Sequence, residues 1–188
     1  MSTTSPSTEL AIGASGLPVG TWTVDPVHSS AHFAVKHMVV ATFRGRFETV
    51  DATLTVTEES ATLEGSVEAG SIVVKDPNLQ GHLGSPDFFD VEQHPQLTFT
   101  SSDIRRDGDE LLVRGELTIK GHTHPLEARG TLVGPAVTLG DVNKIGIQLE
   151  TTVDRTEYGL EWNAPLPSGG FALANDVQLI VELELIES

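Results

Sequence analysis

The sequence of 188 residues contains no cysteine, which excludes disulfide bonds, zinc–thiolate sites and cysteine nucleophiles together. It also lacks any apolar run long enough to span a bilayer, so no integral membrane segment is expected. Basic residues are scarce: 11 Lys and Arg stand against 27 Asp and Glu, which gives a formal net charge of −16. Because such a charge repels phosphate backbones, nucleic acid is not an expected partner.

The first twenty residues, MSTTSPSTELAIGASGLPVG, contain no Lys or Arg and no run of seven apolar residues. They therefore do not resemble a secretory signal, and together with the missing cysteine this favours a cytoplasmic protein. Their high content of Ser, Thr, Pro and Gly predicts a disordered N-terminal tail over residues 1–19. The remaining residues, 20–188, are long enough for one domain with a sizeable core.

Apolar and polar residues alternate with a period of two through most of that domain, which is typical of strands with one buried face. Clear examples are the segments 31–36, 51–57, 61–68, 111–120, 145–149 and 177–185. Turn residues such as Asp107-Gly108 separate the runs. We count about eight or nine strands with mostly short connections, which predicts an antiparallel all-β fold built as two packed sheets or as a closed barrel.

One segment, DPNLQGHLGSPDFFDVEQHP at residues 76–95, lacks this alternation. One short helix after Pro77, or two with the second around residues 86–91, would bring Leu79, Leu83, Phe88 and Phe89 together. We interpret the segment as a lid or plug over one end of a barrel.

Three histidines occur within ten positions in the stretch VDPVHSSAHFAVKHMVVATFRGRF. In a strand, His37 shares the face of Phe33 and Val35, whereas His28 and His32 lie on the other face. Imidazoles on opposite faces of one strand cannot converge on a single metal ion. His122 and His124 form a closer pair, but no third ligand is evident, so we interpret them as solvated turn residues.

Motifs for catalysis are missing as well. There is no Gly-x-Ser-x-Gly elbow, no His-Glu-x-x-His, no phosphate-binding loop and no dinucleotide fingerprint. The sequence therefore predicts a protein that is not an enzyme, with no catalytic and no metal-binding residues.

Five stretches resemble the motifs of one known family. They are, in chain order, TWTVDPVHSSAHFAVKHMVVATFRGRF, HLGSPDFFDVEQHPQLTFTS, VRGELTIKGHTHPLE, TTVDRTEYGL and ANDVQLIVELELI. They span about residues 20–187, and their order matches that of the YceI-like family, also called the lipocalin-like, polyisoprenoid-binding family.

This resemblance implies an all-β fold: an eight-stranded antiparallel lipocalin-like barrel with a short helical segment between strands. A barrel of eight strands is wide enough for one small ligand, and the family's barrel holds an elongated isoprenoid lipid. The resemblance supplies no catalytic residues, and it assigns His28 and His37 to the scaffold motif rather than to a metal site. His32, His122 and His124 are not residues of that pattern.

The expected ligand-binding residues combine inward positions on strands with apolar residues of the irregular segment. They are Phe33, Val35, His37, Phe47, Leu83, Phe88, Phe89, Phe99, Leu117 and Ile119.

The predicted function is the non-enzymatic binding, storage or transport of an isoprenoid lipid, either a polyprenyl chain or an isoprenoid quinone. No cofactor is required beyond that bound lipid or quinone. The expected partner is thus an apolar lipid, and a homodimer is left open as an assembly. Two alternatives remain: a filled barrel that acts as a stress-related interaction module, and a cavity enzyme with His37 as its base. Sequence does not separate a filled barrel from a hollow one, because both need the same inward apolar residues.

Overall fold

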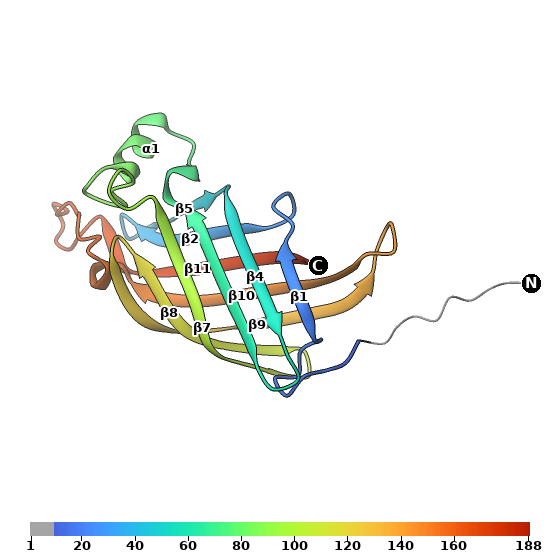
Figure 1. Ribbon diagram of the computed structural model, residues 1–188. Coiled ribbons are helices and arrows are strands. Elements are labelled where there is room, and N and C mark those ends of the chain that lie inside the picture. The colour runs from blue at the N-terminus through green and yellow to red at the C-terminus, as the bar shows by residue number, and fades with distance from the viewer. Residues whose placement is uncertain (1–9) are drawn as a thin grey trace, which may run out of the picture.

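The computed structural model describes residues 10–188, and strands make up most of this part of the chain (Figure 1). The predicted tail residues 1–9 lie outside the described residues. The strands are β1 (Gly20–Val24), β2 (Ser30–His37), β3 (Ala41–Phe47), β4 (Val50–Val56), β5 (Ala61–Glu68), β6 (Ile72–Val73), β7 (Gln96–Asp107), β8 (Glu110–Ile119), β9 (His122–Val137), β10 (Asn143–Asp154) and β11 (Leu173–Glu187). The helical elements are η1 (Ala69–Ser71), α1 (Pro77–Gly84) and η2 (Arg155–Tyr158).

Eight strands close into a barrel in the order β1–β4–β5–β7–β8–β9–β10–β11 and back to β1. Every pairing in this ring is antiparallel. Closure pairs the edges that an open sheet would expose. The structure therefore confirms the all-β, eight-stranded antiparallel barrel with a short helical segment.

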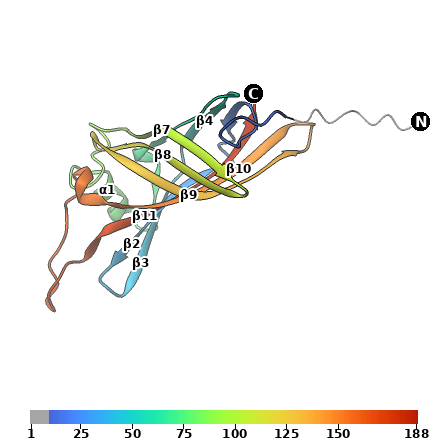
Figure 2. The ribbon, with the colours of Figure 1, turned by 90° about the horizontal axis from the view of Figure 1, so that it is seen from below.

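Strand β11 is long enough to pair with two strands along the same edge. Its C-terminal part pairs with β1, where Leu185 lies opposite Val24, and its N-terminal part pairs with β2, where Val177 lies opposite Val35. Strand β2 then pairs with β3, and β3 pairs with the short β6. The β2–β3 hairpin thus extends the wall beyond the closed ring, and Figure 2 shows it projecting from the body of the molecule.

One half of the barrel interior is filled by side chains that are at most 1% exposed. They come from six different strands and are Trp22, Leu54, Leu111, Leu132, Ile145 and Leu185. Burying a side chain of this size stabilises the fold by about 1.5–3 kcal/mol. Packing in this filled half stabilises the closed ring, so the other half of the interior can remain hollow without loss of the fold.

Residues 10–19 pack against the barrel, so the prediction of a disordered tail is wrong for this part of it. Leu17 is fully buried, and the Ala14 N–H donates to the Glu58 carbonyl at 2.8 Å while the Arg106 N–H donates to the Ser15 carbonyl at 2.9 Å. Gly13 makes the close approach possible, because a Cβ there would lie 2.3 Å from the Thr57 carbonyl oxygen. Composition averaged over twenty residues hid the few apolar residues, Leu10, Leu17 and Val19, that pack against the core.

The irregular segment contains one helix rather than two. In α1, Pro77 occupies the first turn, as predicted, and the Asp76 carboxylate caps the helix by accepting from the Leu79 N–H at 2.9 Å. Around residues 86–91 the chain instead forms turns, because Asp90 adopts a positive φ of 50° and both Phe88 and Asp90 donate to the Ser85 carbonyl. Figure 1 shows this segment at one end of the barrel. Within residues 10–188, no helix has the length and apolar character that a membrane span requires.

Candidate ligand cavity

The hollow half of the barrel contains two adjoining cavities, with volumes of about 160 Å³ and about 280 Å³. Phe47, Leu97, Ile119 and Leu179 line both of them, so the two form neighbouring chambers of one interior. The smaller chamber lies in the middle of the barrel, and the larger one reaches α1 and η2. Together they fall in the lower part of the roughly 300–1,000 Å³ range typical of small-molecule sites.

All ten residues that the sequence predicted as ligand-binding lie on the walls of these chambers. Phe99 and Leu117 line the smaller chamber, and Phe47 and Ile119 line both. The larger chamber is also lined by Phe33, Val35, His37, Leu83, Phe88 and Phe89. The structure thus brings the ten together, while their contact with a ligand stays a prediction.

An aromatic cluster joins the irregular segment to the barrel wall. The Phe33 ring lies 5.9 Å from Phe43, 6.0 Å from Phe47 and 6.4 Å from Phe89, measured between ring centroids. Phe89 also meets Phe47 edge-on at 5.5 Å. Gly45 makes room for this packing, because a Cβ there would lie 2.4 Å from the Phe33 ring. The segment therefore closes the larger chamber as a packed plug.

Small residues at inward positions create the smaller chamber, and the sequence analysis did not single them out. Ala31, Ala52, Gly65 and Ala128 all line it, where a larger side chain would fill the space. The sequence does contain a signal for these positions, since each is a small residue on the inward face of an alternating strand. Gly65, for example, lies between Leu63 and Val67 on that face. A run of small inward residues on several strands marks where a barrel is hollow.

Polar groups gather at the end of the larger chamber, around η2. The Asp154 side chain caps this element by accepting from the Thr156 N–H at 2.9 Å, and Gly159 ends it with a φ of 70°. This short turn places both Arg155 and Tyr158 on the chamber wall. Burial raises the pKa of Tyr158, so its hydroxyl stays protonated.

Arg155 is a buried cation, 6% exposed, and sequence reasoning did not select it as a site residue. Its Nε donates to the Ala174 carbonyl at 2.9 Å, and its Nη1 donates to the carbonyls of Leu160 and Trp162. The Nη2 group is buried without a hydrogen-bond partner among residues 10–188, and no carboxylate of that part of the chain pairs with the guanidinium. Burial accordingly lowers the pKa of Arg155.

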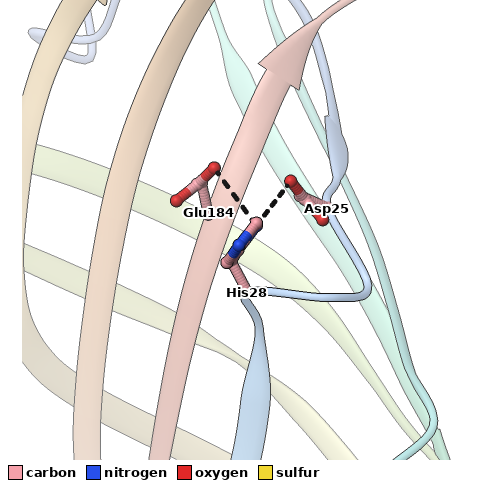
Figure 3. A group of neighbouring side chains, drawn as sticks. All are labelled: Asp25, His28 and Glu184. Atoms are coloured by element: carbon pink, nitrogen blue, oxygen red, sulfur yellow. Dashed lines mark hydrogen bonds and ion pairs between the residues drawn. The ribbon is translucent and has the colours of Figure 1, made fainter. Parts of the chain in front are cut away.

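The three histidines of the first motif serve three different purposes. His37 lines the larger chamber on the same side as Phe33 and Val35, as the alternation predicted. The His32 ring is 2.8 Å from the Ser30 hydroxyl. His28 lies between the carboxylates of Asp25 and Glu184, with Nδ1 at 2.9 Å and 3.8 Å from them (Figure 3). The histidines therefore do not converge.

Asp25, His28 and Glu184 are the one group of three potential ligands found together within the described residues. A cation already lies there: the Lys144 ammonium is 3.3 Å from Asp25 and 2.5 Å from Glu184. We interpret the four residues as a clasp that fixes the bend between β1 and β2 to β10 and β11. The expectation that the protein needs no metal stays a prediction.

His122 and His124 both lie near η2. The His124 ring is 2.9 Å, through Nε2, from the Glu157 carbonyl and packs on the Tyr158 ring at 5.0 Å. A Cβ on Gly159 would lie 2.8 Å from His122 Nε2. His124 thus supports the polar end of the chamber from outside, which differs from its interpretation as a freely solvated residue, whereas His122 is exposed, in agreement with that interpretation.

The clasp predicts a defined pH dependence of stability. The hydrogen bond from His28 lowers the pKa of Asp25 to about 2, and the same bond raises the pKa of His28 above its ordinary value of 6.5. The Asp25 contribution is therefore lost as the pH falls from 3.8 towards 2, and the His28 contribution is lost as the pH rises through its raised pKa. We expect Asp25→Asn to lower the thermal midpoint most between these limits.

The measurement is the difference in thermal midpoint between the wild-type protein and Asp25→Asn as a function of pH. His28→Gln is the companion variant: it should remove the loss on the alkaline side and weaken the loss on the acid side, because the same hydrogen bond shifts both pKa values. A difference that stays constant from acid to alkaline pH would contradict the clasp.

Comparison with known proteins identifies the family of the chain. Residues 22–185 match the model of the YceI-like domain. A UPF0312 protein of Staphylococcus epidermidis is 31% identical over 169 residues, covering 85% of this chain and 94% of the relative. Protein YceI of Escherichia coli O157:H7 is 25% identical, covering 85% and 82%.

Solved structures show the same barrel. BcnA of Burkholderia cenocepacia superposes with a TM-score of 0.71 at 20% identity, covering 88% of this chain and 99% of that one. A polyisoprenoid binding domain from Saccharophagus degradans superposes with a TM-score of 0.68 at 14% identity, covering 89% and 98%. With a family model that spans nearly the whole barrel and a relative of 31% identity, the chain belongs to the YceI-like family.

Proposed function

We propose that the protein binds an isoprenoid lipid inside its barrel and that it stores or carries this lipid without chemical conversion. The observation that carries the proposal is the two-chambered interior, apolar in the middle of the barrel and polar only at the end near η2. The solved relative described as a polyisoprenoid binding domain supports the choice of ligand class.

The smaller chamber suits the hydrocarbon chain. Its inward side chains include Ala52, Leu63, Leu117, Ala128 and Val181, which offer no charge to a ligand. Burying one methylene contributes about 0.8 kcal/mol, so each five-carbon isoprene unit contributes on the order of 3–4 kcal/mol before ordering costs. A few buried units are enough for tight binding.

The larger chamber suits the head group. The unpartnered Nη2 of Arg155 and the Tyr158 hydroxyl are donors at this end, and neither has a hydrogen-bond acceptor among the described side chains and backbone groups. A small shift of the surrounding side chains would let a ligand oxygen reach them. One buried guanidinium matches a quinone carbonyl better than a pyrophosphate, whose several charges need more than one cation. We therefore favour an isoprenoid quinone over a polyprenyl pyrophosphate.

The two alternative functions find less support. His37 lines the larger chamber, but its ring has no hydrogen-bond partner within residues 10–188, so no carboxylate orients it as a base. A wholly filled barrel is at odds with the chambers, although the half that contains Trp22 is filled.

Organic extraction of the purified protein followed by mass spectrometry tests the proposal. We expect a co-purifying isoprenoid lipid, and we expect an added isoprenoid quinone to quench the fluorescence of Trp162, which lines the larger chamber. Trp22 is fully buried in the filled half, so Trp162→Phe should remove most of the quenching. An empty extract, together with a thermal midpoint that added quinone and polyprenol leave unmoved, would reject the lipid-binding function.

A further inference from the structure

Four large apolar side chains are exposed together beside the larger chamber. Met38, Val39 and Val40 form the tip of the β2–β3 hairpin and are 42%, 74% and 89% exposed. Phe171 is 61% exposed on the loop before β11. The Met38 N–H donates to the Ala172 carbonyl at 2.7 Å, which holds the loop against the hairpin. We refer to Met38, Val39, Val40 and Phe171 as the apolar tip.

The backbone of the tip is strained for the residues that occupy it. Met38 and Val39 have φ values of 51° and 65°. Asn and Gly adopt such angles readily in hairpins, whereas a β-branched residue such as Val39 rarely does, so this conformation costs free energy. The exposed side chains make few packing contacts within the protein that could offset this cost. Burial of these side chains against a partner outside the chain would offset it.

The charge around the tip is opposite to that of the molecule as a whole. Residues 30–47 contain Lys36, Arg44 and Arg46 but no Asp or Glu, and residues 163–175 contain no charged residue. Lys36 and Arg44 are both exposed and form no ion pair with any described residue. Asp176, near the start of β11, is also exposed, so this end offers an anionic surface two unpaired cations beside one neighbouring carboxylate. In a chain of net charge −16, such a balance reduces the repulsion from an anionic surface.

The position of the tip connects it to the ligand chambers. His37 directly precedes Met38, while Phe43 and Leu173 follow Val40 and Phe171 within three residues. All three line the larger chamber. Exposed apolar residues flanked by cations, at the end of an apolar cavity, match the chemistry of an anionic bilayer: hydrocarbon beneath a layer of negative charge.

We propose that the apolar tip, with Lys36 and Arg44, is a docking surface for anionic lipid bilayers. The tip inserts between head groups and holds the larger chamber at the membrane surface. The inference rests on the proposed function for its purpose, since a carrier must collect its lipid from a membrane. Docking itself needs no ligand.

The test is co-sedimentation of the full chain with vesicles of equal parts phosphatidylcholine and phosphatidylglycerol that contain no isoprenoid. We expect binding that weakens as salt is added, and the double variant Val39→Asp/Val40→Asp should reduce it by about tenfold or more, since a charge inserted among acyl chains is costly. The matched control is Val137→Asp/Leu139→Asp. These residues are 63% and 97% exposed near the β9–β10 turn, which carries Asp141.

A second variant separates docking from folding. Met38→Asn/Val39→Gly supplies residues suited to the positive φ angles, so we expect a higher thermal midpoint together with weaker vesicle binding. If Met38 and Val39 have no part in docking, this variant would show the higher thermal midpoint while its vesicle binding stays that of the wild type.

The proposal is overturned if wild-type protein ignores the vesicles, in which case a protein partner becomes the better occupant. It is also overturned if both pairs of aspartates reduce binding equally. Because the vesicles contain no isoprenoid, these outcomes are independent of whether lipid is found in the extract.

Discussion

Gly65→Phe is expected to reduce the isoprenoid lipid that remains bound to the purified protein by about tenfold or more. Gly65 faces inward on β5 and lines the smaller chamber. A Cβ at this position would meet only ordinary contacts, 3.5 Å from the Asp51 carbonyl oxygen and 4.0 Å from the Ala52 Cβ. The phenyl ring can therefore enter the space of about 160 Å³ that the lipid chain would use.

Filling this chamber should not unfold the protein, because a side chain that occupies an existing void adds apolar contacts. The thermal midpoint of lipid-free Gly65→Phe is expected to equal or exceed that of the lipid-free wild type. Gly146→Phe is the matched control, since Gly146 lies on the outward face of β10 and a Cβ there would meet no atom within 4 Å. Quantitative mass spectrometry of extracts from the three proteins gives the comparison. Equal lipid content in all three would show that the smaller chamber does not hold the chain.

Gly130→Ala is expected to lower the free energy of unfolding by about 3 kcal/mol or more, which is large for the addition of one methyl group. Gly130 lies on β9, where it pairs with Leu111 of β8 on one side and with Leu149 of β10 on the other. A Cβ at this position would lie 1.7 Å from the Gln148 carbonyl oxygen and 3.0 Å from the Leu149 Cα. Because the obstacle is backbone, β9 and β10 would have to move apart at this point of their pairing.

Urea unfolding followed by circular dichroism measures this effect. Gly65→Ala provides the control, because the same methyl group enters open space there and should change the free energy of unfolding little. A small loss of stability in Gly130→Ala, comparable to that of Gly65→Ala, would contradict the close approach of β9 and β10.

The strands and the inward face of each could be predicted because they are local properties. Side chains alternate between two faces of a strand, so the pattern around Phe33, Leu117 or Leu183 shows its orientation without knowledge of any other strand. The same parity separated His37 from His28 and His32. The start of α1 was equally local, since Asp76 and Pro77 act within one turn.

Two features were not predicted, because they depend on contacts with distant parts of the chain: the packing of residues 10–19 and the turns around residues 86–91. Leu17 becomes buried only because the end of β4, the turn after it and β7 present a surface to residues 13–16. Asp90 leaves the helical region because the turn around it closes on Ser85. No pattern in either segment carries that information.

The sequence by itself determined that this chain is an antiparallel barrel of the YceI-like family, and which apolar residues face its interior. Only the tertiary structure decided that the barrel is filled around Trp22 and hollow around Gly65, because the space at one wall depends on the side chains that cross from the others. It also decided that Arg155 is a buried cation and that Lys144 completes the clasp with Asp25, 119 residues away. Alternation along a strand shows which way each side chain points. Cavity volume and charge pairing depend instead on distances between residues far apart in the chain.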